Sequence, residues 1–180
     1  MKYQLKKGKN IWYSFKMELG EDLGAKYYDS ELREVDPFRI KNPVDAARVF
    51  FAYLKFLILR YCTENNISTD ILYAASIPAS FEANQRKDLL DALMANDMKV
   101  SKQALIDEPN AAFISYAVSR AAEDRPMFIS PDYNSKVLVF DFGGGTCDIS
   151  ILEIGQSANG FFSKNIAISK FTKLGGDDID

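Results

Sequence analysis

The residues of this 180-residue chain that are best suited to chemistry lie between positions 136 and 154. An apolar run, KVLVFDF (136–142), carries Asp141 near its end, and a second run, CDISILEI (147–154), carries Asp148. The loop between the two runs consists of Gly143, Gly144, Gly145 and Thr146. Glycine permits positive φ angles and a close backbone approach to a ligand, and successive N–H groups in such a turn form a nest for phosphate oxygens. The segment therefore predicts a phosphate-binding loop, to which Thr146 adds a hydroxyl donor.

The two aspartates beside this loop would repel a phosphate unless a cation lay between them. Mg²⁺, which is six-coordinate and stays largely hydrated, is the natural choice. A triple glycine alone favours a flexible hairpin turn, but the apolar strand before it and the Thr-x-Asp after it favour the phosphate site. The loop is not a Walker loop, because no Gly-Lys-Ser/Thr follows, and not a dinucleotide fingerprint, because a strand follows instead of a helix.

Composition excludes several other kinds of function. The 22 basic and 25 acidic residues give a net charge of -3, which provides no electrostatic case for a nucleic-acid or membrane partner. The absence of histidine excludes Ser-His-Asp and Cys-His nucleophiles and histidine metal ligands. Cys62 and Cys147 are too far apart for a zinc motif and are predicted to be reduced, buried thiols of a cytoplasmic protein, since no secretory signal is visible.

A long helix is predicted to start at Asn42, a capping residue, with Pro43 at the first helical position. It should end near positions 65–66. Apolar residues recur along it at spacings of three and four, and we expect the following to be buried against segment 71–77 or the next helix: Phe50, Leu54, Leu57 and Ile58. The alternative is an exposed stripe that serves as a partner surface.

The remaining elements predict a mixed α/β sheet with a hairpin. The run ILYAASI, apolar almost throughout, indicates a central strand covered on both faces. A polar turn with Gly155 and Gly160 is expected before the last strand. The expected elements are a strand at 71–77, helix 82–96, a strand near 103–106, a helix from Pro109 to about Ser119, a surface loop at 123–135, and strands at 136–142, 147–154 and 161–171.

The segment DFGGGTCD (141–148) resembles the second phosphate loop of the actin, sugar-kinase and heat-shock ATPase superfamily. Three further segments resemble the DnaK-type (seventy-kilodalton heat-shock) chaperones: IPASFEANQRKDLLDA (77–92), LIDEPNAAFISYA (105–117) and LGGDDID (174–180). All four occur in the order of that family. The resemblance implies an actin-like (ribonuclease H-like) α/β fold with flanking helices and an incomplete domain. Residues 1–135 would belong to lobe one, and residues 136–180 would form the phosphate hairpin and first strands of lobe two.

The resemblance also implies roles for single residues in binding ATP or ADP with Mg²⁺. The loop from Gly143 to Thr146 would hold the β- and γ-phosphates, and the glycines of LGGDDID, Gly175 and Gly176, would contribute to the nucleotide site. Asp141, Asp148 and Glu108 would act on the magnesium shell, largely through water, and on the attacking water. Lys16, in SFKMELG (14–20), would position that water, although a solvated surface lysine fits its sequence equally well. Glu108 and the 141–146 loop are expected to converge on one cleft.

The parent protein is thus expected to be an ATP-hydrolysing chaperone whose clients and co-chaperones bind to parts absent here. A non-hydrolysing actin-like binding or regulatory protein is the alternative, and a sugar kinase fits less well. Departures from the family pattern include Ser80 for tyrosine, Asp107 for asparagine and Asn110 for threonine. The first phosphate loop is expected before this chain and the adenine-binding lobe after it. We therefore expect the chain alone to be inactive, and its truncated sheet to be open to self-association.

Overall fold

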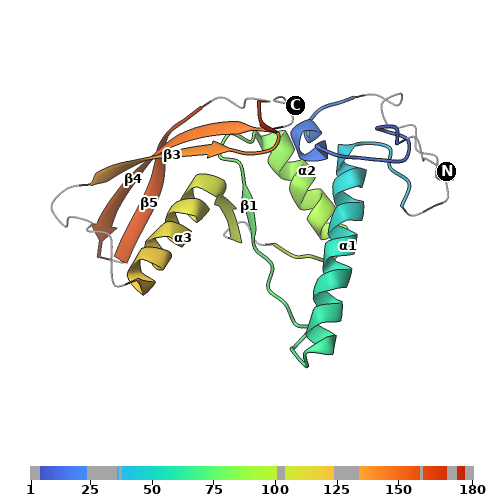
Figure 1. Ribbon diagram of the computed structural model, residues 1–180, viewed down its shortest axis with the longest axis horizontal. Coiled ribbons are helices and arrows are strands. Elements are labelled where there is room, and N and C mark those ends of the chain that lie inside the picture. Colours follow the sequence, from blue (N-terminus) through green and yellow to red (C-terminus); the bar gives the residue numbers. More distant parts are fainter. Residues whose placement is uncertain are drawn as a thin grey trace. The chain divides into compact units, whose positions relative to one another are not determined.

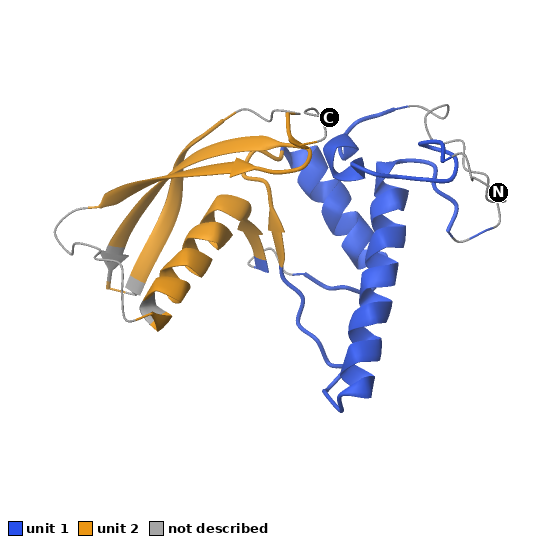
Figure 2. Ribbon diagram, in the orientation of Figure 1, with its two compact units in different colours: residues 1–74, 82–104 blue, residues 75–81, 105–180 orange. Residues whose placement is uncertain are grey.

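The computed structural model describes residues 5–23, 36, 38–100, 104–123, 134–158, 160–169 and 174–176. The elements in chain order are η1 (Phe15–Glu18), α1 (Pro43–Glu64), β1 (Ala75–Ile77), α2 (Ala83–Met94), β2 (Leu105–Asp107), α3 (Glu108–Ala122), β3 (Ser135–Phe142), β4 (Cys147–Ser157) and β5 (Gly160–Ile168) (Figure 1). They form two compact units (Figure 2). Unit 1 contains Met1–Ala74 and Glu82–Ala104, and unit 2 contains Ala75–Phe81 and Leu105–Asp180.

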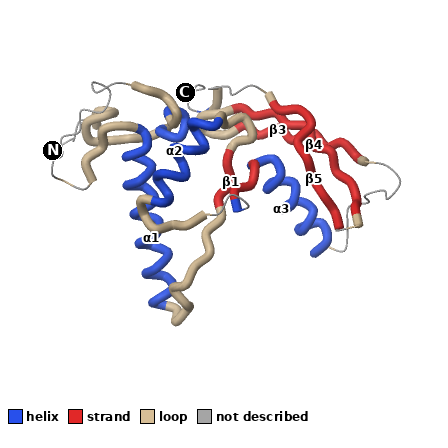
Figure 3. Tube along the Cα trace, turned by 180° about the vertical axis from the view of Figure 1, so that it is seen from behind, coloured by secondary structure: helices blue, strands red, loops and turns tan. Residues whose placement is uncertain are grey.

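Unit 1 is built on α1 and α2, which lie side by side (Figure 3). The predicted start of α1 is confirmed: the Asn42 side chain accepts a hydrogen bond from the Asp45 N–H at 2.8 Å, and Pro43 is the first helical residue. Small residues let the helices approach closely, since Ala47 and Ala92 are both fully buried. The predicted second helix is also confirmed, and it begins with a reciprocal capping box between Glu82 and Gln85.

The predicted burial along α1 is wrong for Phe50, which is 45% exposed. Its ring contacts the Phe15 ring of η1, with 5.8 Å between the centroids. Leu54, Leu57 and Ile58 are half-buried, so the stripe is neither a closed core nor a mostly exposed surface. The reason is length, because α2 has 12 residues and covers only part of the 22-residue α1.

Unit 2 contains a parallel pair, β1 with β2, and an antiparallel sheet in the order β3-β4-β5. The parallel and antiparallel strands therefore belong to two sheets, not one, in the part of the chain that the structure describes. The strand predicted at 71–77 is shorter than expected. Only Ala75–Ile77 pairs with β2, which itself offers three residues, and Leu72 before it is 99% exposed.

The antiparallel sheet packs one face against α3 (Figure 1). Phe113 of α3 forms a core with Leu152 and Ile154 of β4, and Val137 and Val139 of β3 pack against it. The opposite face exposes apolar side chains of β3, namely Leu138, Phe140 and Phe142. The predicted strand at 136–142 is confirmed, but its apolar side chains are only half-buried on the face that α3 covers and exposed on the other.

Gly155 and Gly160 were predicted to lie in a turn, and this prediction is wrong. Gly155 pairs with Phe162 inside the β4–β5 ladder, and Gly160 is the first residue of β5. A Cβ atom on Gly155 would overlap the side-chain oxygen of Asn134 and lie 2.8 Å from the Phe162 ring, so the glycine makes room for both side chains.

No helix among the described residues combines the length and the apolar composition that a membrane span requires.

Candidate functional site

The glycine loop closes the β3–β4 hairpin, as predicted. Phe142 pairs with Cys147 at the end of the ladder, and the Gly143 N–H donates to the Thr146 carbonyl at 2.9 Å. No glycine of this loop has a positive φ angle, because the described glycines with positive φ are Gly8 and Gly20. The glycines of this loop therefore serve close backbone approach and not a special backbone conformation.

Asp141 and Asp148 are direct cross-strand partners at the base of this loop. Residues that face each other across an antiparallel pair project from the same side of the sheet. Their environments differ, since Asp141 is exposed and Asp148 is only 5% exposed. The hairpin thus offers one solvated and one buried carboxylate on the face that α3 covers.

The segment containing Gly175 and Gly176 packs directly on the glycine loop. The Gly176 N–H donates to the Gly143 carbonyl at 3.0 Å. A Cβ atom on Gly175 would lie 2.5 Å from the Gly144 oxygen and 2.6 Å from the Gly145 nitrogen, so only glycine fits there. The fold therefore brings together two glycine segments that lie about 30 positions apart in the sequence. Both are predicted to belong to the nucleotide site.

Ser80 lies beside Asp148. Ile77, Pro78 and Ala79 are buried, and a turn closed by the bond from the Phe81 N–H to the Pro78 carbonyl follows β1. From this turn the Ser80 hydroxyl donates to Asp148 Oδ1 at 2.5 Å. The chain after β1 thus supplies a donor to the buried carboxylate of the hairpin.

Glu108 begins α3 directly after β2, and a chain of hydrogen bonds fixes its neighbours to β5. Asn165 donates to Asp107 Oδ2 at 2.7 Å, Asn110 donates to Asn165 Oδ1 at 3.2 Å, and Ser163 donates to Asn110 Oδ1 at 2.7 Å. Two of these side chains, Asp107 and Asn110, replace the asparagine and threonine of the chaperone pattern. The junction that carries Glu108 is therefore held to the sheet by two residues that depart from that pattern.

The expected convergence of Glu108 with the glycine loop remains a prediction, which two observations support. Ile77 pairs with Asp107, so the turn that reaches Asp148 and the start of α3 leave their parallel strands at the same end. The helix that Glu108 opens also covers the sheet face that Asp148 shares with Leu152 and Ile154.

Lys16 lies on η1 in unit 1, where its side chain is exposed. The other predicted site residues lie in unit 2. The local structure around Lys16 is well defined, since the Gly20 N–H donates to Asp88 Oδ2 at 2.8 Å and Leu19 is 1% exposed. Its role in positioning water stays a prediction.

The described residues contain no cluster of three acidic or thiol side chains able to hold a metal ion directly. The binding of Mg²⁺ largely through water stays a prediction. In phosphate sites Mg²⁺ usually takes one or two carboxylates and keeps several waters. The carboxylates of Asp141 and Asp148, which lie at the base of the glycine loop, match this requirement for one or two carboxylates.

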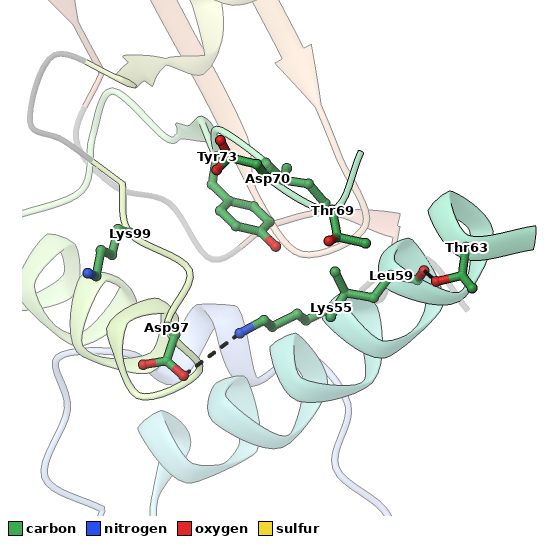
Figure 4. A pocket seen from close by; sticks show the side chains of 9 residues that line it. Lys55, Leu59, Thr63, Thr69, Asp70, Tyr73, Asp97 and Lys99 are labelled. Atoms are coloured by element: carbon green, nitrogen blue, oxygen red, sulfur yellow. Dashed lines mark hydrogen bonds and ion pairs between the residues drawn. The ribbon is translucent and has the colours of Figure 1, made fainter. Parts of the chain in front are cut away.

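A separate hollow of about 750 Å³ lies in unit 1 (Figure 4). Its walls come from α1, from the segment before β1 and from the chain after α2, and Lys55 reaches across it to Asp97 at 3.8 Å. None of the predicted site residues lines it. The hollow is therefore not the nucleotide site that the sequence indicates.

Sequence reasoning missed two parts of this arrangement. The contact of Ser80 with Asp148 joins positions 68 apart, and the polar chain through Asn165 joins positions 55 and 58 apart. The departures at positions 80, 107 and 110 were the available signal, because each changes the length or hydrogen-bonding capacity of a side chain.

Comparison with known proteins agrees with the motifs. The family model described as Hsp70 protein matches residues 50–180. The heat shock cognate HSP70 protein of Trypanosoma brucei brucei is 35% identical over 169 residues, which is 93% of this chain and 22% of that protein. The DnaK chaperone proteins of Elusimicrobium minutum and Nitrosopumilus maritimus are 36% and 38% identical over 105 residues, 58% of this chain and 14% of theirs. This chain thus spans less than a quarter of the length of these relatives, and it belongs to the Hsp70 family.

Proposed function

We propose that this chain is part of the nucleotide-binding domain of a chaperone that binds and hydrolyses ATP with Mg²⁺. One observation carries the proposal: Gly175 and Gly176 pack on the Gly143–Thr146 loop, beside the carboxylates of Asp141 and Asp148. Exposed backbone next to paired carboxylates suits a phosphate chain that is bridged by a hydrated cation.

In this proposal the backbone of the loop and the Thr146 hydroxyl bind the β- and γ-phosphates. Asp141 and Asp148 orient water molecules around the cation, and Glu108 does so from the start of α3. Lys16 positions the attacking water. Bound Mg²⁺ would neutralise the charge that develops on the phosphates during transfer. Phosphoryl transfer depends on such positioning and charge stabilisation, so no nucleophilic side chain is needed.

We propose further that residues 1–135 belong to lobe one of that domain and residues 136–180 to lobe two. ATP would then bind between lobes, and this chain would supply about half of the groups that contact it. The chain alone should bind Mg-ATP weakly or not at all, and a calorimetric titration measures this directly. Micromolar or tighter binding would show that the chain holds a more complete site.

Hydrolysis is best tested in a complete domain. In a chimera, residues 50–180 would replace the matching segment of the Elusimicrobium minutum DnaK protein, and ATP hydrolysis would be measured with and without Mg²⁺. The proposal expects magnesium-dependent hydrolysis. Tight nucleotide binding by a folded chimera without hydrolysis would favour the non-hydrolysing regulatory alternative. A phosphorylated sugar product would favour the kinase alternative.

Clients and co-chaperones would engage the parent protein through parts outside this chain. The proposed location is the cytoplasm, in keeping with the two free thiols. Cys62 is buried as predicted, whereas Cys147 is only half-buried.

A further inference from the structure

Asp148 is the buried member of the aspartate pair, with 5% of its surface exposed. A carboxylate removed from water is costly unless hydrogen bonds stabilise it. Within the described part of the chain, the side chain that donates to it is Ser80, whose hydroxyl lies 2.5 Å from Oδ1. This distance is typical of a strong, charge-assisted O–H···O⁻ hydrogen bond.

The hydroxyl itself is held by the main chain around it. Ser80 follows three buried residues at the end of β1, and the turn bond from Phe81 to Pro78, at 3.1 Å, fixes the backbone at this point. β1 is in turn paired with β2, the strand that leads into Glu108. The position of Ser80 is therefore set by the parallel strands, while Asp148 belongs to the hairpin.

We propose that Ser80 is a positioning residue that fixes the carboxylate of Asp148 in one orientation beside the glycine loop. The functional meaning of this contact rests on the proposed role of Asp148 in nucleotide binding. The chaperone pattern has a tyrosine at this position, whose phenol oxygen lies much farther from the backbone, so this mode of orienting Asp148 is specific to chains with a short hydroxyl there.

The test is a double-mutant cycle in this chain without nucleotide. Ser80→Ala should lower the folding equilibrium constant roughly 10- to 100-fold, because hydrogen bonds to charged groups are among the stronger ones. In an Asp148→Ala background the same change should cost less than about threefold, since the acceptor is already gone. Ser76→Ala is the matched control: Ser76 is an exposed serine of β1, and its replacement should have little effect.

A second readout follows the carboxylate itself. The ¹³C chemical shift of the Asp148 carboxyl carbon at neutral pH should move in Ser80→Ala, return toward the original value in Ser80→Thr, and stay unchanged in Ser76→Ala. If Ser80→Ala does not fold, a folded Ser80→Thr with the original shift supports the proposal, and any other result for Ser80→Thr contradicts it.

The proposal would be overturned if Ser80→Ala lowered the folding equilibrium constant equally with and without Asp148. It would also be overturned if the ¹³C chemical shift of the Asp148 carboxyl carbon did not change in Ser80→Ala. The cycle contains no nucleotide, so its outcome does not depend on catalysis. A chimera that fails to hydrolyse ATP would refute the proposed function and leave the coupling of Ser80 with Asp148 intact.

Discussion

Replacing Gly175 with alanine should disrupt the packing of its segment on the glycine loop. The added Cβ atom would lie 2.5 Å from the Gly144 carbonyl oxygen and 2.6 Å from the Gly144 carbon and the Gly145 nitrogen. Carbon atoms in van der Waals contact are about 3.5–4.0 Å apart, so one segment must move by about 1 Å. The obstructing atoms are backbone and cannot rotate away as a flexible side chain could.

The expected cost is about 1–3 kcal/mol in the free energy of unfolding, the usual range for overpacking in a well-packed site. Gly176→Ala is a matched control, because its Cβ atom would meet nothing closer than Gly144 Cα at 3.7 Å. Neither glycine has a positive φ angle, so backbone strain does not separate the two variants. Both substitutions also change the entropy of the unfolded chain in the same way.

Urea denaturation followed by circular dichroism gives the two free energies, and the amide resonances of residues 143–146 report whether the loop moves. Gly175→Ala should be less stable than Gly176→Ala and should shift those resonances. Equal stabilities with unchanged loop resonances would refute the close packing of Gly175 on Gly144.

Two further predictions concern the surroundings of the site and the surface of α2. Asn165→Ala removes the donor to Asp107 and the acceptor for Asn110, and should cost about 1–3 kcal/mol of stability and speed hydrogen exchange in the first turn of α3. Unchanged exchange there would contradict the proposed anchoring of Glu108. The pKa of Lys87 is raised by its hydrogen bond to Asp91, 2.6 Å away, and by the charge of that carboxylate. The small stabilisation from this exposed pair should therefore be present at neutral pH and lost as pH rises through the raised pKa. An NMR titration measures the pKa of Lys87 with and without Asp91→Asn. The same pKa in both proteins would contradict the prediction.

Local signals in the sequence predicted the elements that depend on nearby residues. Asn42 and Pro43 mark the start of α1 because capping and the fixed φ of proline act within one helical turn. The hairpin around Gly143 and Asp148 was also predictable, since both strands and the loop are contiguous in sequence. Motif order then identified the family, which no single element could do.

Features that depend on distant partners were not predictable. The apolar run at 71–77 indicates a buried strand, yet its pairing is limited by what β2 offers, and Leu72 is exposed. Gly155 looks like a turn residue, but its role is set by the side chains of Asn134 and of Phe162 on the next strand. The same holds for Ser80, whose partner Asp148 is 68 positions away.

The most direct test of the central claim is the rate of ATP hydrolysis by the chimera when Asp148 is replaced by asparagine. In the proposal Asp148 orients water around the cation, and misplacing such groups by about 1 Å can lower the rate about 10²-fold. Asp148→Asn should show a loss of this size, while Asp70→Asn, an exposed carboxylate of unit 1, should hydrolyse ATP as the unmodified chimera does. Hydrolysis by Asp148→Asn at the unmodified rate would contradict the assignment of the hairpin as the nucleotide site.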